Sequence, residues 1–234
     1  TAVHSGGGML ITHSSNPTLT NSILWGSSPQ EVCFGQFGTS SITITYSDIQ
    51  GGQDSIATND NGTVTWGSGN IDIEPMFVDT ANGDYHLLAS SQCINGGHPD
   101  STDSDGSRAD IGAYPYLNNY SGPTWYITED GNDSTATGAS DDPFRSIQAG
   151  INFSSDADSV TVAAGTYVEN INFRGRNIKV AGADRETTII DGDSLNSVVR
   201  FTASDQSYTA TIKNFTIKNG FGIPYEDSGW YGGS

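Results

Sequence analysis

Hydrophobic residues occur along this chain in short runs, where they alternate with small or hydroxyl-bearing residues. Residues 42–45 (ITIT) and 160–162 (VTV) are examples, and stretches rich in Gly, Ser, Asn and Asp separate such runs. Alternation with a period of two, bounded by turn-forming residues, is typical of β-strands. The pattern therefore predicts an all-β fold with many short strands and many turns.

One nine-residue pattern occurs twice, 25 residues apart: T-[LI]-T-x-S-x-[LI]-x-G matches residues 18–26 and 43–51. A weaker third copy covers residues 211–218 (TIKNFTIK). A period near 25 is too short for a domain and fits one coil of a solenoid, which buries its apolar face against neighbouring coils. We therefore expect the apolar residue after the first Thr of each copy to lie on one shared face. These residues are Leu19, Ile44 and Ile212.

Asn21 and Asn214 occupy the same position of this repeat, directly after the first strand. An Asn side-chain amide there can bond the equivalent backbone of the next coil. Asn also tolerates the left-handed backbone conformation of a tight turn. The sequence leaves both interpretations open.

One short helix is predicted near residues 142–152. Asp142 and Pro143 form a helix start, with Asp142 as the N-cap and Pro143 at the first helical position. An apolar stripe with helical spacing follows. It consists of Phe144, Ile147 and Ile151.

The second half of the chain carries four stretches in a familiar order: residues 125–127 (WYI), 130–133 (DGND), 142–150 (DPFRSIQAG) and 160–171 (VTVAAGTYVENI). Together they resemble the N-terminal cap and first coils of right-handed parallel β-helix proteins of the pectate-lyase-like superfamily. The resemblance implies that the short helix plugs the open first coil and that the G-T-Y-x-E-N run leads into coil one. It implies a fold and says little about activity.

The first half resembles the opposite end of such a protein. Residues 72–79 and 83–87 are similar to closing strands, and residues 103–114 (DSDGSRADIGAY) are similar to the terminal motif of large bacterial surface and secreted repeat proteins. The two resemblances together predict three parts. These are C-terminal coils and a closing segment over residues 1–116, a linker over 117–124, and an N-terminal cap with first coils over 125–234.

Both ends of the sequence have the Gly-rich character of coils from the middle of a β-helix. Exposed coil ends would present unpaired strand edges, which soluble proteins avoid. We therefore expect copies to join end to end, either as one unit of a tandem array or as subunits that stack head to tail into a filament. The residues expected at these joints are Gly6, Gly7, Gly8, Trp230, Tyr231 and Gly232.

The net charge of −18 excludes nucleic acid and anionic membranes as partners, and no apolar stretch is long enough for membrane insertion. Such a charge suits an extracellular or cell-surface protein, or one that binds divalent cations. One loop concentrates the acidic residues that would bind calcium through hard oxygen ligands. The four are Asp100, Asp103, Asp105 and Asp110. The spacing does not match an EF-hand, and a solvated acidic loop is the alternative.

Catalytic patterns are scarce. Asp191 and Asp193 are the best carboxylate pair for glycoside hydrolysis, although a D-G-D turn between coils explains them better. The four histidines are scattered, with no nucleophile–base or metal-ligand spacing. The two cysteines, Cys33 and Cys93, permit one disulfide, and a buried free thiol is the alternative.

These observations predict an extracellular structural or adhesive β-helix protein without catalytic residues, whose partners are copies of itself. Calcium is the only cofactor expected. The alternative is a β-helix that binds or cleaves polysaccharide.

Overall fold

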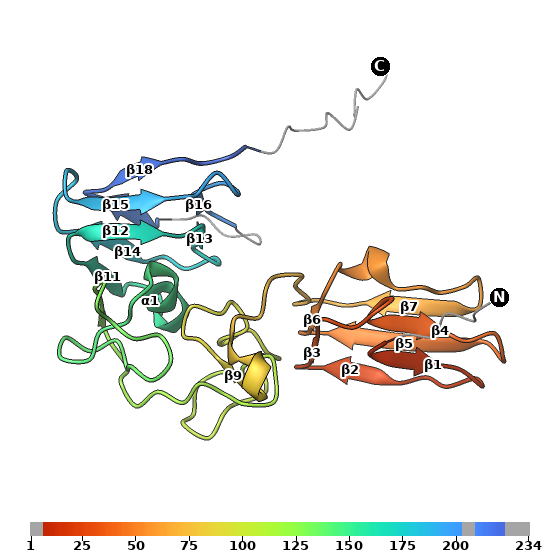
Figure 1. Cartoon of the computed structure of the whole chain (residues 1–234). Helices are drawn as coiled ribbons and strands as arrows, with labels where there is room; N and C mark the ends of the chain where they lie inside the picture. Colours follow the sequence, from red (N-terminus) through yellow and green to blue (C-terminus); the bar gives the residue numbers. More distant parts are fainter. Residues whose placement is uncertain (1–6, 203–208, 223–234) are drawn as a thin grey trace, which may run out of the picture. The chain divides into compact units, whose positions relative to one another are not determined.

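The computed structural model describes residues 7–202 and 209–222, which divide into two compact units (Figure 1). Unit 1 extends to Ser121 and also includes Asn132–Thr137. Unit 2 comprises Gly122–Gly131 and the chain from Gly138 onward. The boundary after Ser121 lies inside the predicted linker. The assignment of Asn132–Thr137 to unit 1 was not foreseen.

The all-β prediction is confirmed, because the described chain contains many short strands and a single α-helix. No helix in this part of the chain is long and apolar enough to cross a membrane.

In unit 1 the chain passes three strand positions repeatedly, and strands at one position pair in parallel. One sheet contains β2 (Thr18–Thr20), β5 (Ser40–Thr45) and β7 (Gly62–Trp66). The other two pairs are β1 (Met9–Ile11) with β4 (Val32–Phe34), and β3 (Ile23–Leu24) with β6 (Asp48–Ile49). Single bridges from Cys33 to Ala57 and from Asp48 to Ile71 extend these pairs to a third layer.

The register confirms the predicted 25-residue repeat. Leu19 lies beside Ile44, and the flanking threonines pair in the same way. The expectation was wrong for Ile212, which lies beside Val180 in another sheet, in unit 2. Alternation in β5 buries Ile42 and Ile44 and turns Thr43 outward. The apolar side chains of successive layers therefore form one core. Its fully buried members are Ile11, Val32, Phe34, Ile42, Ile44 and Ile49, with Ile56 at the margin.

The corner after this strand has a left-handed backbone in each copy of the repeat, with φ of 51° at Asn21, 47° at Tyr46 and 61° at Asn214. The interpretation of these residues as turn formers is therefore confirmed. The Asn214 amide also donates to Gly182 O at 3.3 Å in the preceding layer. Asn21 differs, because its Oδ1 accepts the N–H of His98.

The remainder of unit 1 closes with less regular structure. Strands β8 (Phe77–Asp79) and β9 (Asp84–Leu87) form an antiparallel hairpin around the short 3-10 helix η2 (Thr80–Asn82). Another 3-10 turn, η1 (Gln53–Ser55), follows β6. Most of residues 88–121 form turns and loops.

Unit 2 repeats the three-position arrangement with parallel strands throughout. The first position contains β10 (Thr124–Ile127), β11 (Ser159–Val162), β14 (Lys179–Gly182) and β17 (Thr211–Lys213). The second contains β12 (Gly165–Val168), β15 (Thr188–Asp191) and β18 (Thr216–Lys218). The third contains β13 (Ile171–Asn172) and β16 (Val199–Arg200).

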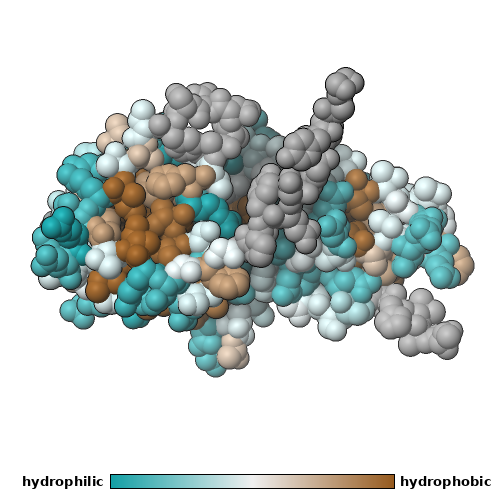
Figure 2. All heavy atoms as spheres, turned by 90° about the horizontal axis from the view of Figure 1, so that it is seen from above, coloured by the Kyte–Doolittle hydropathy of each residue, from teal (hydrophilic) through white to brown (hydrophobic). Residues whose placement is uncertain are grey.

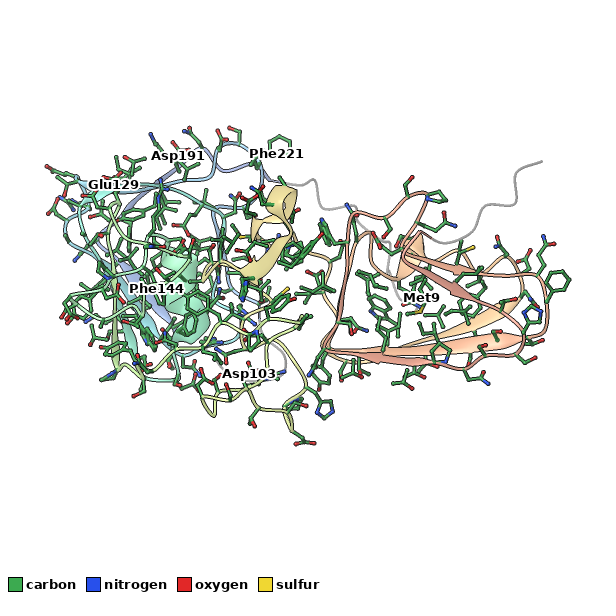
Figure 3. The ribbon with its side chains drawn as sticks, turned by 60° about the horizontal axis from the view of Figure 1, so that its bottom comes forward. Met9, Asp103, Glu129, Phe144, Asp191 and Phe221 are labelled. Carbon is green, nitrogen blue, oxygen red and sulfur yellow. The ribbon has the colours of Figure 1, made fainter. Side chains whose placement is uncertain are left out.

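Helix α1 (Ile147–Phe153) exists, but its predicted start was wrong. Ser146, not Asp142, is the N-cap, and its Oγ accepts the Ala149 N–H. Asp142 instead closes a tight turn with Ala139, and Phe144 continues in extended conformation, donating its N–H to Tyr126 O. This bridge to β10 competes with helix formation and delays the helix by one turn. Phe144 and the helix both belong to the interior of unit 2 (Figure 3).

The helix start is held from outside the helix by Glu169, the acidic residue of the G-T-Y-x-E-N run. Its two carboxylate oxygens accept the N–H groups of Ile147 and Gln148 at 2.8 and 3.0 Å. These are among the N–H groups that lack a partner within the helix. A carboxylate there makes charge-assisted hydrogen bonds and also interacts favourably with the helix dipole.

Replacing Glu169 by Gln is expected to lower the free energy of unfolding by about 1–2 kcal/mol, because the charge and one acceptor are lost. Urea denaturation followed by circular dichroism would measure the change. Glu186→Gln is the matched control, since Glu186 is exposed in the same unit. Equal losses in the two variants would contradict a capping role for Glu169.

Candidate functional site

Unit 2 ends in a layer whose strands have a partner on one side only, among the described residues. This layer, which we call the unit 2 end, contains β16, β17 and β18. Ile217 and Phe221 are about half exposed there, and Phe201 stacks on the buried ring of Phe173. Figure 2, viewed from the side of β18, shows hydrophobic side chains gathered on this part of unit 2. The unit 2 end therefore combines unpaired strand edges with exposed apolar side chains.

Unit 1 begins with a comparable layer, the unit 1 end, which contains β1, β2 and β3. Each of these strands has one strand partner among the described residues, and Leu10 is half exposed. Strand β7, in the third layer, likewise pairs with β5 alone in the part of the chain that the structure describes.

The two ends carry related sequences in the same local structure. At the unit 1 end, Thr18–Thr20 is followed by the left-handed Asn21 and then by β3. At the unit 2 end, Thr211–Lys213 is followed by the left-handed Asn214 and then by β18. The same strand–corner–strand geometry stacks layer on layer within unit 1, so the two ends have matching backbone shapes.

Two of the residues expected at the joints are described and lie in the first layer. Gly7 donates its N–H to Gln30 O, and a Cβ on Gly7 or Gly8 would crowd Ser28 or Glu31. Both glycines therefore permit close packing against the second layer, and their role in assembly stays a prediction. Gly6, Trp230, Tyr231 and Gly232 lie outside the described residues.

The acid-rich loop uses its carboxylates to bind backbone N–H groups. Asp103 Oδ2 accepts the N–H of Asp110 at 3.0 Å. Asp105 accepts from both the N–H and the hydroxyl of Ser107, and from the N–H of Asn118. Burial raises the pKa of Asp105, but these hydrogen bonds outweigh it and lower the pKa below the ordinary value. Figure 3 places Asp103 in this loop.

These hydrogen bonds engage carboxylate oxygens that the predicted calcium site would need as ligands. Asp100 is exposed, and its Oδ2 lies 3.9 Å from His98 Nδ1. No three His, Cys, Asp or Glu side chains come together to hold a metal ion anywhere in the described parts of the chain. Three of the four aspartates, Asp103, Asp105 and Asp110, accept backbone N–H groups that shape the loop, and calcium binding stays a prediction.

Asp110 is the most buried member of this loop. It accepts the N–H groups of Asn95 and Tyr116 at 2.7 and 2.8 Å, which ties together three points of the closing segment. Burial raises its pKa to about 7, and the nearby Asp103 and Asp105 act in the same direction.

A second buried carboxylate, Asp48 in β6, was not singled out from the sequence. It is fully buried, accepts the N–H of Ile73, and receives a hydrogen bond from the Cys93 thiol at 3.4 Å. Burial raises its pKa to about 7, with Asp72 and Glu74 adding to the effect. Asp48 occupies the repeat position held by Ile23 in the first copy, so a polar residue in an apolar position was the available signal. Both cysteines are buried thiols that form no disulfide.

The carboxylate pair considered for hydrolysis forms a turn. Asp191 at the end of β15 accepts the N–H of Asp193, and it also pairs with Asn219 and with Lys218 Nζ at 3.2 Å. The Asp193 N–H is the main cause that lowers the pKa of Asp191. An ionised carboxylate held in this way is not suited to donate a proton.

One pocket in unit 1 is lined by a histidine and a carboxylate that no sequence motif connects. His86 Nδ1 lies 2.7 Å from Asp84 Oδ1, and the His86 ring packs at a tilt against the Tyr114 ring, with the ring centroids 4.7 Å apart. The Asp84 pKa is lowered, chiefly by the backbone N–H of His86. The pocket has a volume of about 490 Å³, and Tyr116 and Leu117 also line it.

A family described as "Protein of unknown function (DUF1565)" matches residues 129–174. This stretch includes α1, β11, β12 and β13, and the family is associated with parallel β-helix proteins. No curated protein and no solved structure matches the chain.

Proposed function

We propose that both units are stacks of right-handed parallel β-helix turns, and that the protein is an extracellular structural or adhesive element that assembles end to end. The parallel strand positions, repeated layer by layer in each unit, support the β-helix. The family match over residues 129–174 supports it as well.

The observation that carries the proposed assembly is the match between the two ends. Within the described residues, each end presents strands that pair on one side, and each continues through a left-handed Asn into a second strand. A strand edge is a ready template for another strand, and a head-to-tail contact that does not close produces a fibre. The partner of the unit 2 end is therefore the unit 1 end of another copy.

The N–H groups at the unit 2 end support this pairing. Thr211 donates its N–H to Ile178 O, toward the stack. Because successive N–H groups of a strand point to opposite sides, the N–H of Ile212 points away from the stack. A strand added to β17 would accept this hydrogen bond, and the next strand of the same added turn, placed on β18, would cover the half-exposed Ile217.

Replacing Ile217 by Lys is expected to abolish fibres, because assembly would bury an unpaired charge. Electron microscopy and analytical ultracentrifugation, each with and without calcium, would measure this. Val168→Lys is the matched control, since Val168 is exposed in the same sheet but in β12, two strands from the unit 2 end. It should leave fibres intact.

A second variant, Leu19→Lys, blocks the unit 1 end and tests the head-to-tail geometry. Each blocked protein alone should be monomeric, whereas an equimolar mixture should form dimers through the two unmodified ends. Fibres from either blocked protein, or monomers from the unmodified protein in both conditions, would contradict the proposal.

The alternative function is polysaccharide binding or cleavage, and the pocket with Asp84, His86 and Tyr116 favours it. Exposed rings stack on sugar faces, and a carboxylate accepts sugar hydroxyl groups. A polysaccharide screen for binding and for release of reducing ends, repeated with His86→Ala, would test this candidate.

A further inference from the structure

Glu31, directly before β4, has a buried carboxylate of which only one oxygen accepts a hydrogen bond. Its side chain is nearly inaccessible, and Oε1 accepts the Ser27 N–H at 2.7 Å. Among the described residues, Oε2 of Glu31 is the one buried side-chain oxygen or nitrogen without a hydrogen-bond partner. Buried polar atoms are nearly always paired, because an unpaired one is unfavourable. This oxygen therefore suggests a ligand.

Glu31 also lines a pocket of about 560 Å³ in unit 1, between the loop before β4 and the 3-10 turn η1. The lining is acidic and contains no Lys, Arg or aromatic residue. Its polar side chains belong to Ser27, Gln30, Glu31, Gln50, Asp54 and Ser55.

The walls of the pocket are fixed by hydrogen bonds before any ligand binds. Gln50 Oε1 accepts the Gly26 N–H at 2.9 Å, and the Ser55 hydroxyl donates to Gln50 O and Gly52 O. Gly8 leaves room beside the carboxylate, since a Cβ there would lie 3.0 Å from Glu31 Oε2. A preorganised site binds with a smaller loss of conformational entropy.

The chemistry of the lining selects among cations. The two carboxylates of Glu31 and Asp54 favour a positively charged ligand. A single metal ion fits poorly, because no three metal-ligating side chains come together in the described chain and the pocket is far larger than one ion. A protonated amine carries three N–H donors and makes charge-assisted hydrogen bonds to carboxylates. We infer that this pocket binds a ligand with a primary ammonium group, which donates to the exposed Asp54 and, after a small movement of the buried Glu31 side chain, to Glu31 Oε2.

Saturation-transfer NMR with n-butylammonium chloride tests this inference on the whole protein, whether monomeric or assembled. Saturable transfer to the butyl protons is expected at millimolar ligand. Glu31→Gln should weaken binding by about tenfold or more, because one charge-assisted hydrogen bond and its charge are lost. Asp54→Asn should weaken it less, and it is exposed enough to leave the fold unchanged.

Matched controls separate this site from general attraction to an acidic protein. Asp60→Asn removes an exposed charge outside the pocket and should leave the affinity unchanged. Butanol and sodium butyrate should show no saturable transfer. Equal weakening in Asp60→Asn and Asp54→Asn, equal binding of butanol, or full competition by calcium chloride would overturn the inference.

Discussion

Replacing Asp48 by Asn is expected to remove a large part of the pH dependence of folding stability between pH 3.8 and about 7. Asp48 is fully buried beside the Cys93 thiol, and its burial raises the pKa to about 7. This pKa shift means that the folded protein stabilises the protonated form of Asp48 over the ionised form by about 4 kcal/mol more than the unfolded chain does. Asn resembles the protonated carboxyl in shape and charge.

The sign follows from proton binding. The folded state holds a proton on Asp48 up to about pH 7, whereas the unfolded chain releases it near pH 3.8. The folded state therefore binds more protons in this interval, and stability falls as the pH rises. Asp110 contributes a fall of the same sign. Asp84 and Asp191 have lowered pKa values, so they stabilise the folded state in their ionised form and lose this stabilising contribution only at more acidic pH.

Urea denaturation at a series of pH values would measure this effect. The Asp48→Asn protein should show a shallower slope and a higher stability than the unmodified protein at pH above 7. Asp60→Asn removes an exposed charge in the same unit and controls for the reduced net charge. An unchanged slope in Asp48→Asn would contradict the raised pKa.

The second large effect is expected at Gly62, at the start of β7. Phe34 is fully buried in the layer below, and a Cβ on Gly62 would overlap its ring. Gly62→Ala is therefore expected to destabilise unit 1 by about 1–3 kcal/mol through overpacking. Phe34→Ala should remove about 3–5 kcal/mol, because it leaves a cavity in the core.

A double-mutant cycle makes this prediction specific. In the Phe34→Ala background the same Gly62→Ala change should be neutral or stabilising, because the methyl group then occupies the vacated space. Gly222→Ala is the control, since, its chain neighbours aside, no atom of the described residues lies within 4 Å of its added Cβ. Additive losses from Gly62→Ala and Phe34→Ala would show that the ring is not the obstacle.

The repeat was predictable because each layer places the same residue types at equivalent positions to bury its apolar side chains. Thr18, Leu19 and Thr20 pair with Thr43, Ile44 and Thr45, as their alignment in the sequence indicates. The helix start was not predictable from local preference. Asp142 and Pro143 suit a helix, but pairing of Phe144 with β10 takes precedence.

The acidic residues were harder to interpret, because their roles depend on neighbours distant in sequence. Spacing made Asp103 and Asp110 resemble calcium ligands, whereas both accept backbone N–H groups in the fold. Glu169 caps a helix that begins 22 residues earlier. No sequence pattern around Glu31 distinguishes it from other acidic residues. Asp48 gave a usable signal, since a carboxylate replaces an apolar residue of the repeat.

The segment Asn132–Thr137 has a consequence for how such a chain can be divided in evolution. It belongs to unit 1, where Ala89 donates its N–H to Asp133 O and Tyr116 donates its hydroxyl to Ala136 O, yet unit 2 residues precede and follow it. A recombination event at the boundary after Ser121 would separate unit 1 from one of its own parts. A gene fragment that keeps unit 1 whole must therefore extend at least through Thr137.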